Sequence, residues 1–197
     1  ADRRRAIEEI DRRLATQPGV KGSGAVSTLA LRGYTWTGDA TIEGRAPSDY
    51  ERELRHKSVT PGYFAAMGIR LLAGRLLEER DTQDQPQVAV VNLALARKYF
   101  TGADAVGKRI TYGRPQDKVP WVTIVGVVGD EQQDALDKAA QPQVYSPIRQ
   151  QMQNPMTFVV RSTLDPSAAV AAARRDVQAV DRDLALTSVT TLEQVVS

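Results

Sequence analysis

The segment from Gly102 to Lys108 has residue types and a spacing that could bind a phosphate group. Its two glycines and the following lysine match the loop that holds nucleotide phosphates in many NTPases. Three features argue against this function. Arg109 stands where a serine or threonine hydroxyl would bind Mg²⁺, a helix pattern precedes the segment, and a strand pattern follows it. Because a phosphate loop needs a helix N-terminus after the lysine, we interpret the segment as a helix-to-strand turn.

Two glycine motifs fall short of a cofactor-binding or catalytic signature. Gly126 and Gly129 supply half of a dinucleotide-binding fingerprint, without the Gly-x-Gly pair or the helix pattern that should accompany it. Gly22-Ser23-Gly24 lacks the spacing of a nucleophile elbow. Glycines within a strand pattern more often mark a bulge or a close approach of two backbones, and we expect that role for both motifs.

His56 is the single histidine of the chain, which excludes a multi-histidine metal site. A catalytic relay built on several histidines is excluded for the same reason. The neighbours of His56 include Glu51, Arg52, Glu53 and Arg55. A polar side chain in such a charged segment is usually hydrated, so we predict that His56 is exposed to solvent.

Two acidic clusters could bind a cation or supply a pair of carboxylates for acid/base chemistry. They consist of Glu78, Glu79, Asp81 and Asp84, and of Asp130, Glu131, Asp134 and Asp137. Neither has the Asp-x-Asp-x-Asp-Gly spacing of a calcium loop. Acidic residues placed among Arg, Lys and Gln are typical of a solvated loop or helix face. We therefore predict no catalytic, cofactor-binding or metal-binding residue, no cofactor, and no enzymatic activity.

Composition sets the remaining limits. The 197 residues are 42% hydrophobic and 25% charged, which is typical of a folded globular chain rather than a disordered one. The 26 Lys and Arg are balanced by 24 Asp and Glu, so the composition argues against a nucleic-acid partner. There is no cysteine, which excludes disulfides and thiol chemistry. The chain starts and stops within helix patterns, so we expect it to be a piece of a longer protein.

Both ends of the chain show the same order of elements. Apolar residues at helical spacing from Ala6 to Leu14 predict a helix that stops at Gln17, and Val20 to Leu29 predicts a strand. Met156 to Arg161 predicts a strand, followed by a helix with Asp165 as its N-cap. A strand over Leu184 to Val189 and a capping box from Thr190 to Glu193 complete the pattern.

The middle of the chain is richer in strands and turns. Thr60 and Gly68 are predicted to bound a short helix. Val88 to Val91 is predicted to form a buried strand, and Asn92 should cap a helix that reaches Phe100. Further strands are predicted at 108–112 and 121–128, whereas 39–57 gives no clear pattern. We therefore predict an α+β fold with two lobes, in which a split β-α-β layer from residues 1–32 and 155–197 carries an inserted β-rich lobe of residues 33–154.

An ordered series of motifs resembles the extracytoplasmic core domain of MacB/FtsX-type ABC transporter permeases, in particular their acidobacterial-type branch. In that family the layer and the insert are called porter and sabre. The departure at Asp104-Ala105, where the family often has Asp-Pro, changes only a turn. The matching segments are Val59 to Arg75, Val88 to Phe100, Gly107 to Ile110, Val122 to Asp130, Pro142 to Pro147, Met156 to Arg161, the Asp165-Pro helix and Leu184 to Val189.

The resemblance implies a non-catalytic domain that relays ATP-driven movement of transmembrane helices to a periplasmic substrate or partner. It implies a location on the periplasmic face of the bacterial inner membrane, in a protein that is integral to that membrane. The implied partners are the flanking transmembrane helices, a second permease copy or half, a cytoplasmic ABC ATPase and a periplasmic membrane-fusion protein. A stand-alone periplasmic ligand-binding or adaptor module is the alternative that the sequence leaves open.

Overall fold

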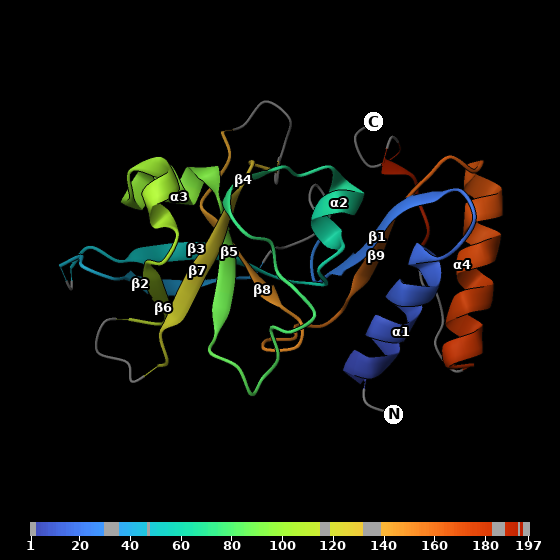
Figure 1. Ribbon diagram of the computed structural model, residues 1–197, viewed down its shortest axis with the longest axis horizontal. Coiled ribbons are helices and arrows are strands. Elements are labelled where there is room, and N and C mark those ends of the chain that lie inside the picture. Colours follow the sequence, from blue (N-terminus) through green and yellow to red (C-terminus); the bar gives the residue numbers. More distant parts are fainter. Residues whose placement is uncertain are drawn as a thin grey trace.

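The computed structural model describes residues 3–29, 36–46, 48–114, 119–131, 139–182, 188–192 and 194, and these form two lobes on one continuous sheet (Figure 1). The predicted α+β class is confirmed. The helices are α1 (Arg3–Ala15), α2 (Tyr63–Met67), α3 (Leu93–Tyr99), the 3-10 helix η1 (Gly102–Ala105) and α4 (Pro166–Val180). The strands are β1 (Val20–Val26), β2 (Thr37–Ile42), β3 (Glu51–Val59), β4 (Leu71–Gly74), β5 (Val88–Asn92), β6 (Arg109–Tyr112), β7 (Val122–Val128), β8 (Gln143–Pro147) and β9 (Thr157–Ser162).

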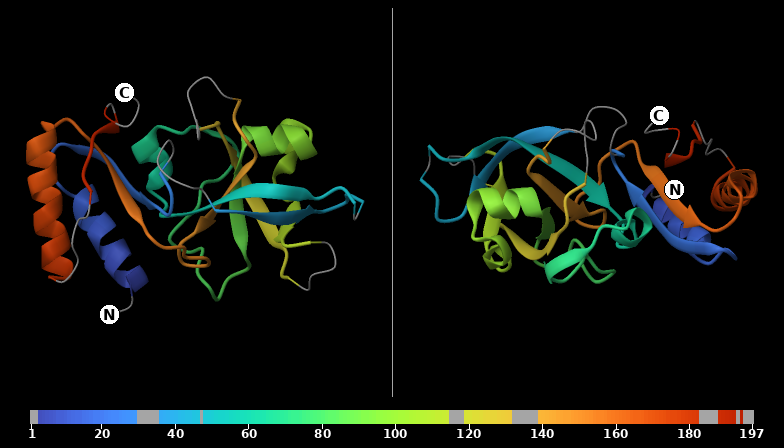
Figure 2. Two further views of the ribbon diagram at one scale, coloured as in Figure 1. Left: turned by 180° about the vertical axis from the view of Figure 1, so that it is seen from behind. Right: turned by 90° about the horizontal axis from the view of Figure 1, so that it is seen from above.

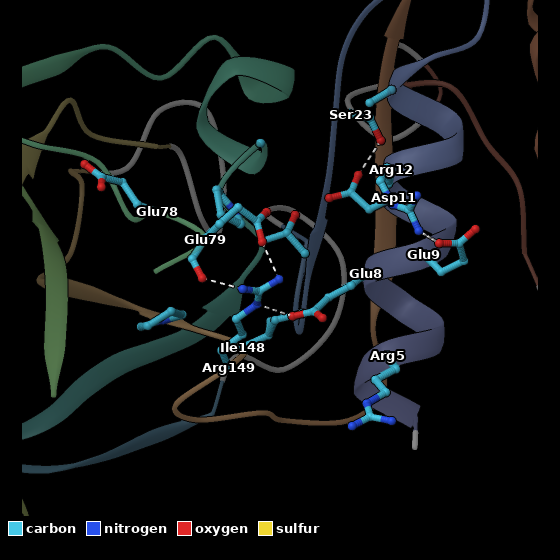
Figure 3. A pocket seen from close by; sticks show the side chains of 15 residues that line it. Arg5, Glu8, Glu9, Asp11, Arg12, Ser23, Glu78, Glu79, Ile148 and Arg149 are labelled. Atoms are coloured by element: carbon cyan, nitrogen blue, oxygen red, sulfur yellow. Dashed lines mark hydrogen bonds and ion pairs between the residues drawn. The ribbon is translucent and has the colours of Figure 1, made fainter. Parts of the chain in front are cut away.

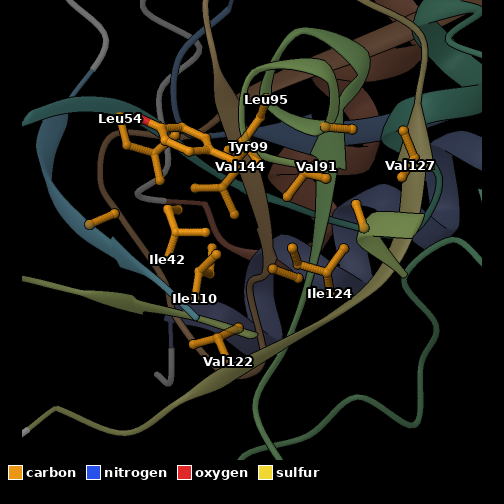
Figure 4. Close-up of a cluster of buried hydrophobic side chains, with 14 residues drawn as sticks. Ile42, Leu54, Val91, Leu95, Tyr99, Ile110, Val122, Ile124, Val127 and Val144 are labelled. Atoms are coloured by element: carbon orange, nitrogen blue, oxygen red, sulfur yellow. The ribbon is translucent and has the colours of Figure 1, made fainter. Parts of the chain in front are cut away.

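Six strands close into a barrel. They follow the order β2-β6-β7-β5-β8-β3, and β3 pairs again with β2. The β5–β7 and β3–β8 pairs are parallel and the other pairs in the ring are antiparallel. One face of every ring strand contributes to a common core that α3 joins with Leu95 and Tyr99 (Figure 4). Because β2 pairs with β3, the ring closes without an unpaired edge, and the backbone groups of these two strands are protected from pairing with other chains.

A second layer continues the sheet past β3. β1 pairs with β9 along its whole length and touches β3 at one registered pair, Val26 with Val59. Helices α1 and α4 lie side by side next to this two-stranded layer (Figures 1 and 2). Apolar residues of α1, Ile10 and Leu14, pack with Val177 of α4. The two ends of the chain thus build one layer, and the barrel is formed by the residues between them.

Local sequence signals place most helix ends correctly. Asn92 accepts a hydrogen bond from the Leu95 N–H, and Asp165 accepts from the N–H groups of the first turn of α4. Gly68 ends α2 with a left-handed φ of 72°, a conformation that glycine adopts without strain.

Two predicted caps are wrong. The Thr60 hydroxyl does not cap α2 but accepts a hydrogen bond from the Ala25 N–H of β1. The C-terminal capping box lies one residue later than predicted, because Thr191 and Gln194 exchange hydrogen bonds between side chain and backbone. Glu193 and most of the strand predicted over 184–189 lie outside the described residues.

Candidate functional site at the junction of the two lobes

Helix α2 rests directly on β1, and glycines permit the contact. A Cβ atom at Gly24 would lie 2.3 Å from the Cα of Tyr63, and one at Gly62 would lie 2.0 Å from the carbonyl oxygen of Ser23. The C-terminal end of α2 is held by Arg161 of β9, whose Nε donates to the Ala66 carbonyl at 3.1 Å. The close approach predicted for Gly22-Ser23-Gly24 is confirmed, and it fixes α2 to the β1–β9 layer.

A cleft of about 640 Å³ lies between α1 and the barrel lobe (Figure 3). Its apolar part comes from Ala15, Pro61, Pro147 and Ile148. Charged side chains from both sides surround this part: Arg5, Glu8, Glu9, Asp11 and Arg12 of α1, and Glu78, Glu79 and Arg149. The residues that line the cleft therefore come from the N-terminal end of the chain and from the segment that forms the barrel lobe.

Arg149 spans the cleft from the turn that follows β8. Its Nε donates to Oε1 of Glu8 at 2.6 Å, and its other guanidinium nitrogens contact the carboxylate and the carbonyl of Glu79 (Figure 3). Arg4 of α1 donates in turn to the backbone carbonyl of Arg149 at 3.0 Å. One arginine thus connects α1 with the segment that follows β4.

A buried charge network lies beside the cleft, where β3, α2 and β8 meet. Nζ of Lys57 lies 2.9 Å from Oε2 of Glu131, and the hydroxyl of Tyr63 donates to Oε1 at 2.6 Å. The Tyr145 hydroxyl donates to the same carboxylate at 3.2 Å. The Lys57 side chain is 0% exposed and that of Glu131 5% exposed. The prediction that Glu131 belongs to a solvated face is wrong, because its charge is compensated inside the protein rather than by water.

Burial controls the ionisation of this network. Removal from water lowers the pKa of Lys57, and Glu131 opposes that effect by stabilising the ammonium. Burial and the negative charge of Glu131 both raise the pKa of Tyr63, and the same two causes act on Tyr145. The tyrosines therefore stay neutral and act as hydrogen-bond donors to one carboxylate, which holds three elements at a single point.

His56 is buried, so the prediction of an exposed histidine is wrong. The residue is 2% exposed and its ring lies 4.6 Å from the rings of both Trp36 and Tyr112. Neither ring nitrogen has a hydrogen-bond partner among the described residues. Burial without a partner disfavours the charged imidazolium and lowers the pKa of His56 to about 4.

The acidic cluster near Glu78 also departs from the prediction at one position. Asp81 is 4% exposed and accepts two hydrogen bonds from Arg75, at 2.8 and 2.9 Å, and one from the Glu78 N–H. Burial opposes ionisation, but these hydrogen bonds outweigh it and lower the pKa of Asp81. Asp84 is exposed as predicted, whereas Asp134 and Asp137 lie outside the described residues.

The phosphate-loop-like segment is the turn that the sequence predicts. Residues 102–105 form η1, the N–H of Gly107 donates to the Ile124 carbonyl, and β6 starts at Arg109. Arg109 forms an ion pair with Glu43. Gly126 marks a tight crossing, since a Cβ there would lie 2.0 Å from the Arg75 carbonyl oxygen. The predicted close approach is thus confirmed for Gly126, whereas a Cβ at Gly129 would have no contact nearer than 3.8 Å.

Two features are absent from the described part of the chain. Its His, Asp and Glu residues form no cluster of three or more that could bind a metal ion. Its helices include none with the length and apolar character needed to span a bilayer.

The sequence matches the family of MacB-like periplasmic core domains over residues 2–180. The chain belongs to this family. Among curated proteins, the macrolide export ATP-binding/permease protein MacB of Neisseria gonorrhoeae and that of Neisseria meningitidis are each 32% identical to this MacB-like domain over 66 residues. Each match covers 34% of this chain and 10% of the relative, so the chain matches only a small part of those proteins.

Solved structures share the fold of this MacB-like domain at low identity. The periplasmic region of MacB from Actinobacillus actinomycetemcomitans has a TM-score of 0.59 and 16% identity, over 87% of this chain and 72% of that one. The extracellular domain of the noncanonical ABC-type transporter YknZ from Gram-positive bacteria has a TM-score of 0.57 and 16% identity, over 88% and 82%. A domain of a putative permease from Porphyromonas gingivalis has a TM-score of 0.53 and 18% identity, over 93% of this chain and 70% of that one. The resemblance found in the sequence is confirmed.

The residues that meet at the junction were not predicted from the sequence as a group. Glu8 and Arg149 are separated by 141 positions, and Lys57 and Glu131 by 74. No local pattern links partners at such separations. One local signal was available for His56: Leu54, His56 and Ser58 alternate along β3 and share the face that points into the barrel core.

Proposed function

We propose that this chain is the non-catalytic extracytoplasmic domain of an ABC transporter permease and that it relays movement of transmembrane helices to a periplasmic substrate or partner. The observation that carries the proposal is that both chain ends build one layer, in which α1 and α4 pack together against β1 and β9. A displacement of α1 therefore acts on this layer and, through the contacts of Glu8 and Arg4 with Arg149, on the barrel lobe. Membership of the MacB-like family supports the same role.

The two lobes correspond, in this proposal, to residues 1–32 with 155–197 and to residues 33–154. Helix α2 belongs to the second range by sequence but packs on β1, so it forms the connection between the lobes. The direct contact of α2 with β1 and the hydrogen bond from Tyr63 to the buried carboxylate of Glu131 make this connection between the lobes rigid.

The proposed location is the periplasmic face of the inner membrane, within an integral membrane protein. The proposed partners are the flanking transmembrane helices, a second permease copy or half, a cytoplasmic ABC ATPase and a membrane-fusion protein in the periplasm. The near balance of 26 cationic and 24 anionic residues argues against a nucleic-acid partner. Family membership supports a permease over a stand-alone ligand-binding or adaptor module, which remains the second candidate.

Flanking sequence gives the first test. The full-length protein should carry about 20 consecutive apolar residues upstream of this chain and another such span downstream. Soluble sequence on both sides would refute the permease and favour the stand-alone module.

A reversible cross-link gives the functional test. Glu8→Cys and Glu79→Cys, joined by a reducible thiol cross-linker in the reconstituted permease with its ATPase, would fix α1 to the barrel lobe. Gln17→Cys with Asp176→Cys is the matched control, because those side chains are hydrogen-bonded to each other within one layer. We expect the first cross-link to lower the rate of ATP hydrolysis, reduction to restore it, and the control to have little effect. Unchanged ATP hydrolysis with the first pair would refute the relay.

A further inference from the structure

We propose that Arg149 is a latch that holds the N-terminal half of α1 against the barrel lobe, and that its release opens the cleft between them. The inference rests on the proposed function, because it names the contact that changes when a membrane helix moves α1. It assigns a mechanical role to an arginine that the sequence motifs did not single out.

The turn that carries Arg149 is fixed to the barrel lobe. The Ile148 N–H donates to the Val59 carbonyl of β3 at 3.1 Å. The Gln150 side chain accepts from the Val88 N–H at 2.9 Å and donates to the carbonyls of Thr82 and Pro86 at 3.0 Å. These bonds hold the backbone on both sides of Arg149, so the latch side chain reaches α1 from a support that stays with the barrel.

Helix α1 has two zones with different attachments. Its C-terminal half is tied to its own layer, since Ile10 and Leu14 pack against α4 and Asp11 accepts from the Ser23 hydroxyl at 2.5 Å. Its N-terminal half instead faces the turn after β8. There Ile7 packs with Ile148 as well as with Ala25 of its own layer, and Glu8 binds Arg149. Loss of the Arg149 side chain would remove the ion pair that ties the first half of α1 to the barrel lobe and would leave only the packing of Ile7 and the Arg4 hydrogen bond there, while the second half stays in place.

The latch is exposed enough to open and close. The Arg149 side chain is 31% exposed, that of Glu8 27% and that of Glu79 73%. Ion pairs of this kind contribute about twofold to fivefold each to an equilibrium constant and are screened by salt. The neighbouring pair of Lys57 and Glu131 has side chains that are 0% and 5% exposed and is shielded from salt. The junction therefore combines a permanent buried contact with a releasable one at its surface.

Distance measurements between spin labels test the latch in this 197-residue chain. The chain contains no cysteine, so Arg3→Cys on α1 and Arg97→Cys on α3 provide two unique labels on exposed positions. We expect a narrow distance distribution at low salt. Arg149→Met should lengthen and broaden it, with about a tenfold rise in the ratio of open to closed molecules. Salt at 1 M should have the same effect on the wild type and little further effect on Arg149→Met.

Two controls separate the latch from a general loss of structure. Arg13→Met removes an arginine of α1 whose partner, Glu9, lies on the same helix, and it should leave the distance distribution unchanged. A label at Gln178→Cys on α4 should keep its distance to Arg97→Cys in every variant. An Arg149→Met distribution identical to that of the wild type would overturn the latch, and so would equal broadening in Arg13→Met.

The reconstituted permease separates failure of the latch from failure of the proposed function. If Arg149→Met opens the isolated chain and also changes ATP-driven coupling in the full protein, both inferences are supported. If it opens the chain and leaves coupling unchanged, the latch is present but its role in the relay is refuted. If the distances do not change, the latch is refuted whatever the cross-linking experiment shows.

Discussion

Between pH 7 and pH 5, acid should destabilise this domain mainly through one residue, His56. Its pKa is about 4 in the folded chain against an ordinary value of 6.5, because the ring is buried between Trp36 and Tyr112 without a hydrogen-bond partner in the described structure. The unfolded chain therefore binds a proton more readily than the folded chain at every pH between these two values. Stability must fall as the pH falls through this window.

The expected loss follows from these two pKa values. Between pH 7 and pH 5 the free energy of unfolding should fall by about 2 kcal/mol, and the full loss below pH 4 approaches about 3 kcal/mol. Carboxylates with lowered pKa values, such as Asp81 and Glu51, add to the loss mainly below about pH 5, where the carboxylates of the unfolded chain begin to bind protons. The change in the free energy of unfolding between pH 7 and pH 5 therefore reports mainly on His56.

Urea denaturation at pH 7, 6 and 5 measures the loss, with His56→Phe as the comparison. Phenylalanine keeps an aromatic ring between Trp36 and Tyr112 but cannot bind a proton. We expect the variant to lose much less than the wild type between pH 7 and pH 5, whatever its absolute stability. Because His56 is the only histidine, its ring protons also give a unique NMR titration. Equal pH slopes, or a titration midpoint near 6.5, would refute the reasoning.

Three further perturbations test the junction and the ends of the chain by denaturation. Glu131→Gln leaves Lys57 buried without its charged partner and should lower the free energy of unfolding by about 3 to 5 kcal/mol. The double variant Glu131→Gln with Lys57→Met should recover most of that loss. A double variant no more stable than the single one would contradict the network. Gly24→Ala should cost about 1 to 3 kcal/mol because its Cβ would lie 2.3 Å from the backbone of α2, and Gly129→Ala, with a nearest contact of 3.8 Å, is the control. Asp165→Ala removes the N-cap of α4 and should cost about 1 kcal/mol, seen as a lower Tm.

Elements with local signals could be predicted from the sequence. The apolar spacing of α1, the side-chain cap at Asn92 and the glycine stop at Gly68 each depend on residues within one or two helical turns. Such signals act before any tertiary contact forms, so they can be recognised without knowing the fold. The resemblance of the ordered motifs to a known family supplied the overall arrangement that local signals could not.

The prediction failed where burial depends on distant partners. β3 carries Glu51, Arg55 and Lys57, which is unusual for a strand that lies in a closed barrel. Lys57 is tolerated because Glu131 neutralises it from another part of the chain, and Glu51 because it binds Lys98 and the hydroxyl of Tyr99. A charged stretch whose counter-ions are remote in sequence has the same pattern as a solvated one, so the strand and the buried His56 were both missed.

The order of strands in the sheet also has a consequence for how the chain folds. The barrel strands run from β2 to β8 without leaving the lobe, whereas β1 must wait for β9 before its outer edge is paired. Contacts between residues so far apart form slowly, because a long loop must close first. During synthesis α1 and β1 emerge before the barrel strands, and their contacts with β9 and α4 form last. We therefore expect barrel closure to precede assembly of the layer, and the apolar side of α1 to be the surface most in need of protection in the nascent chain.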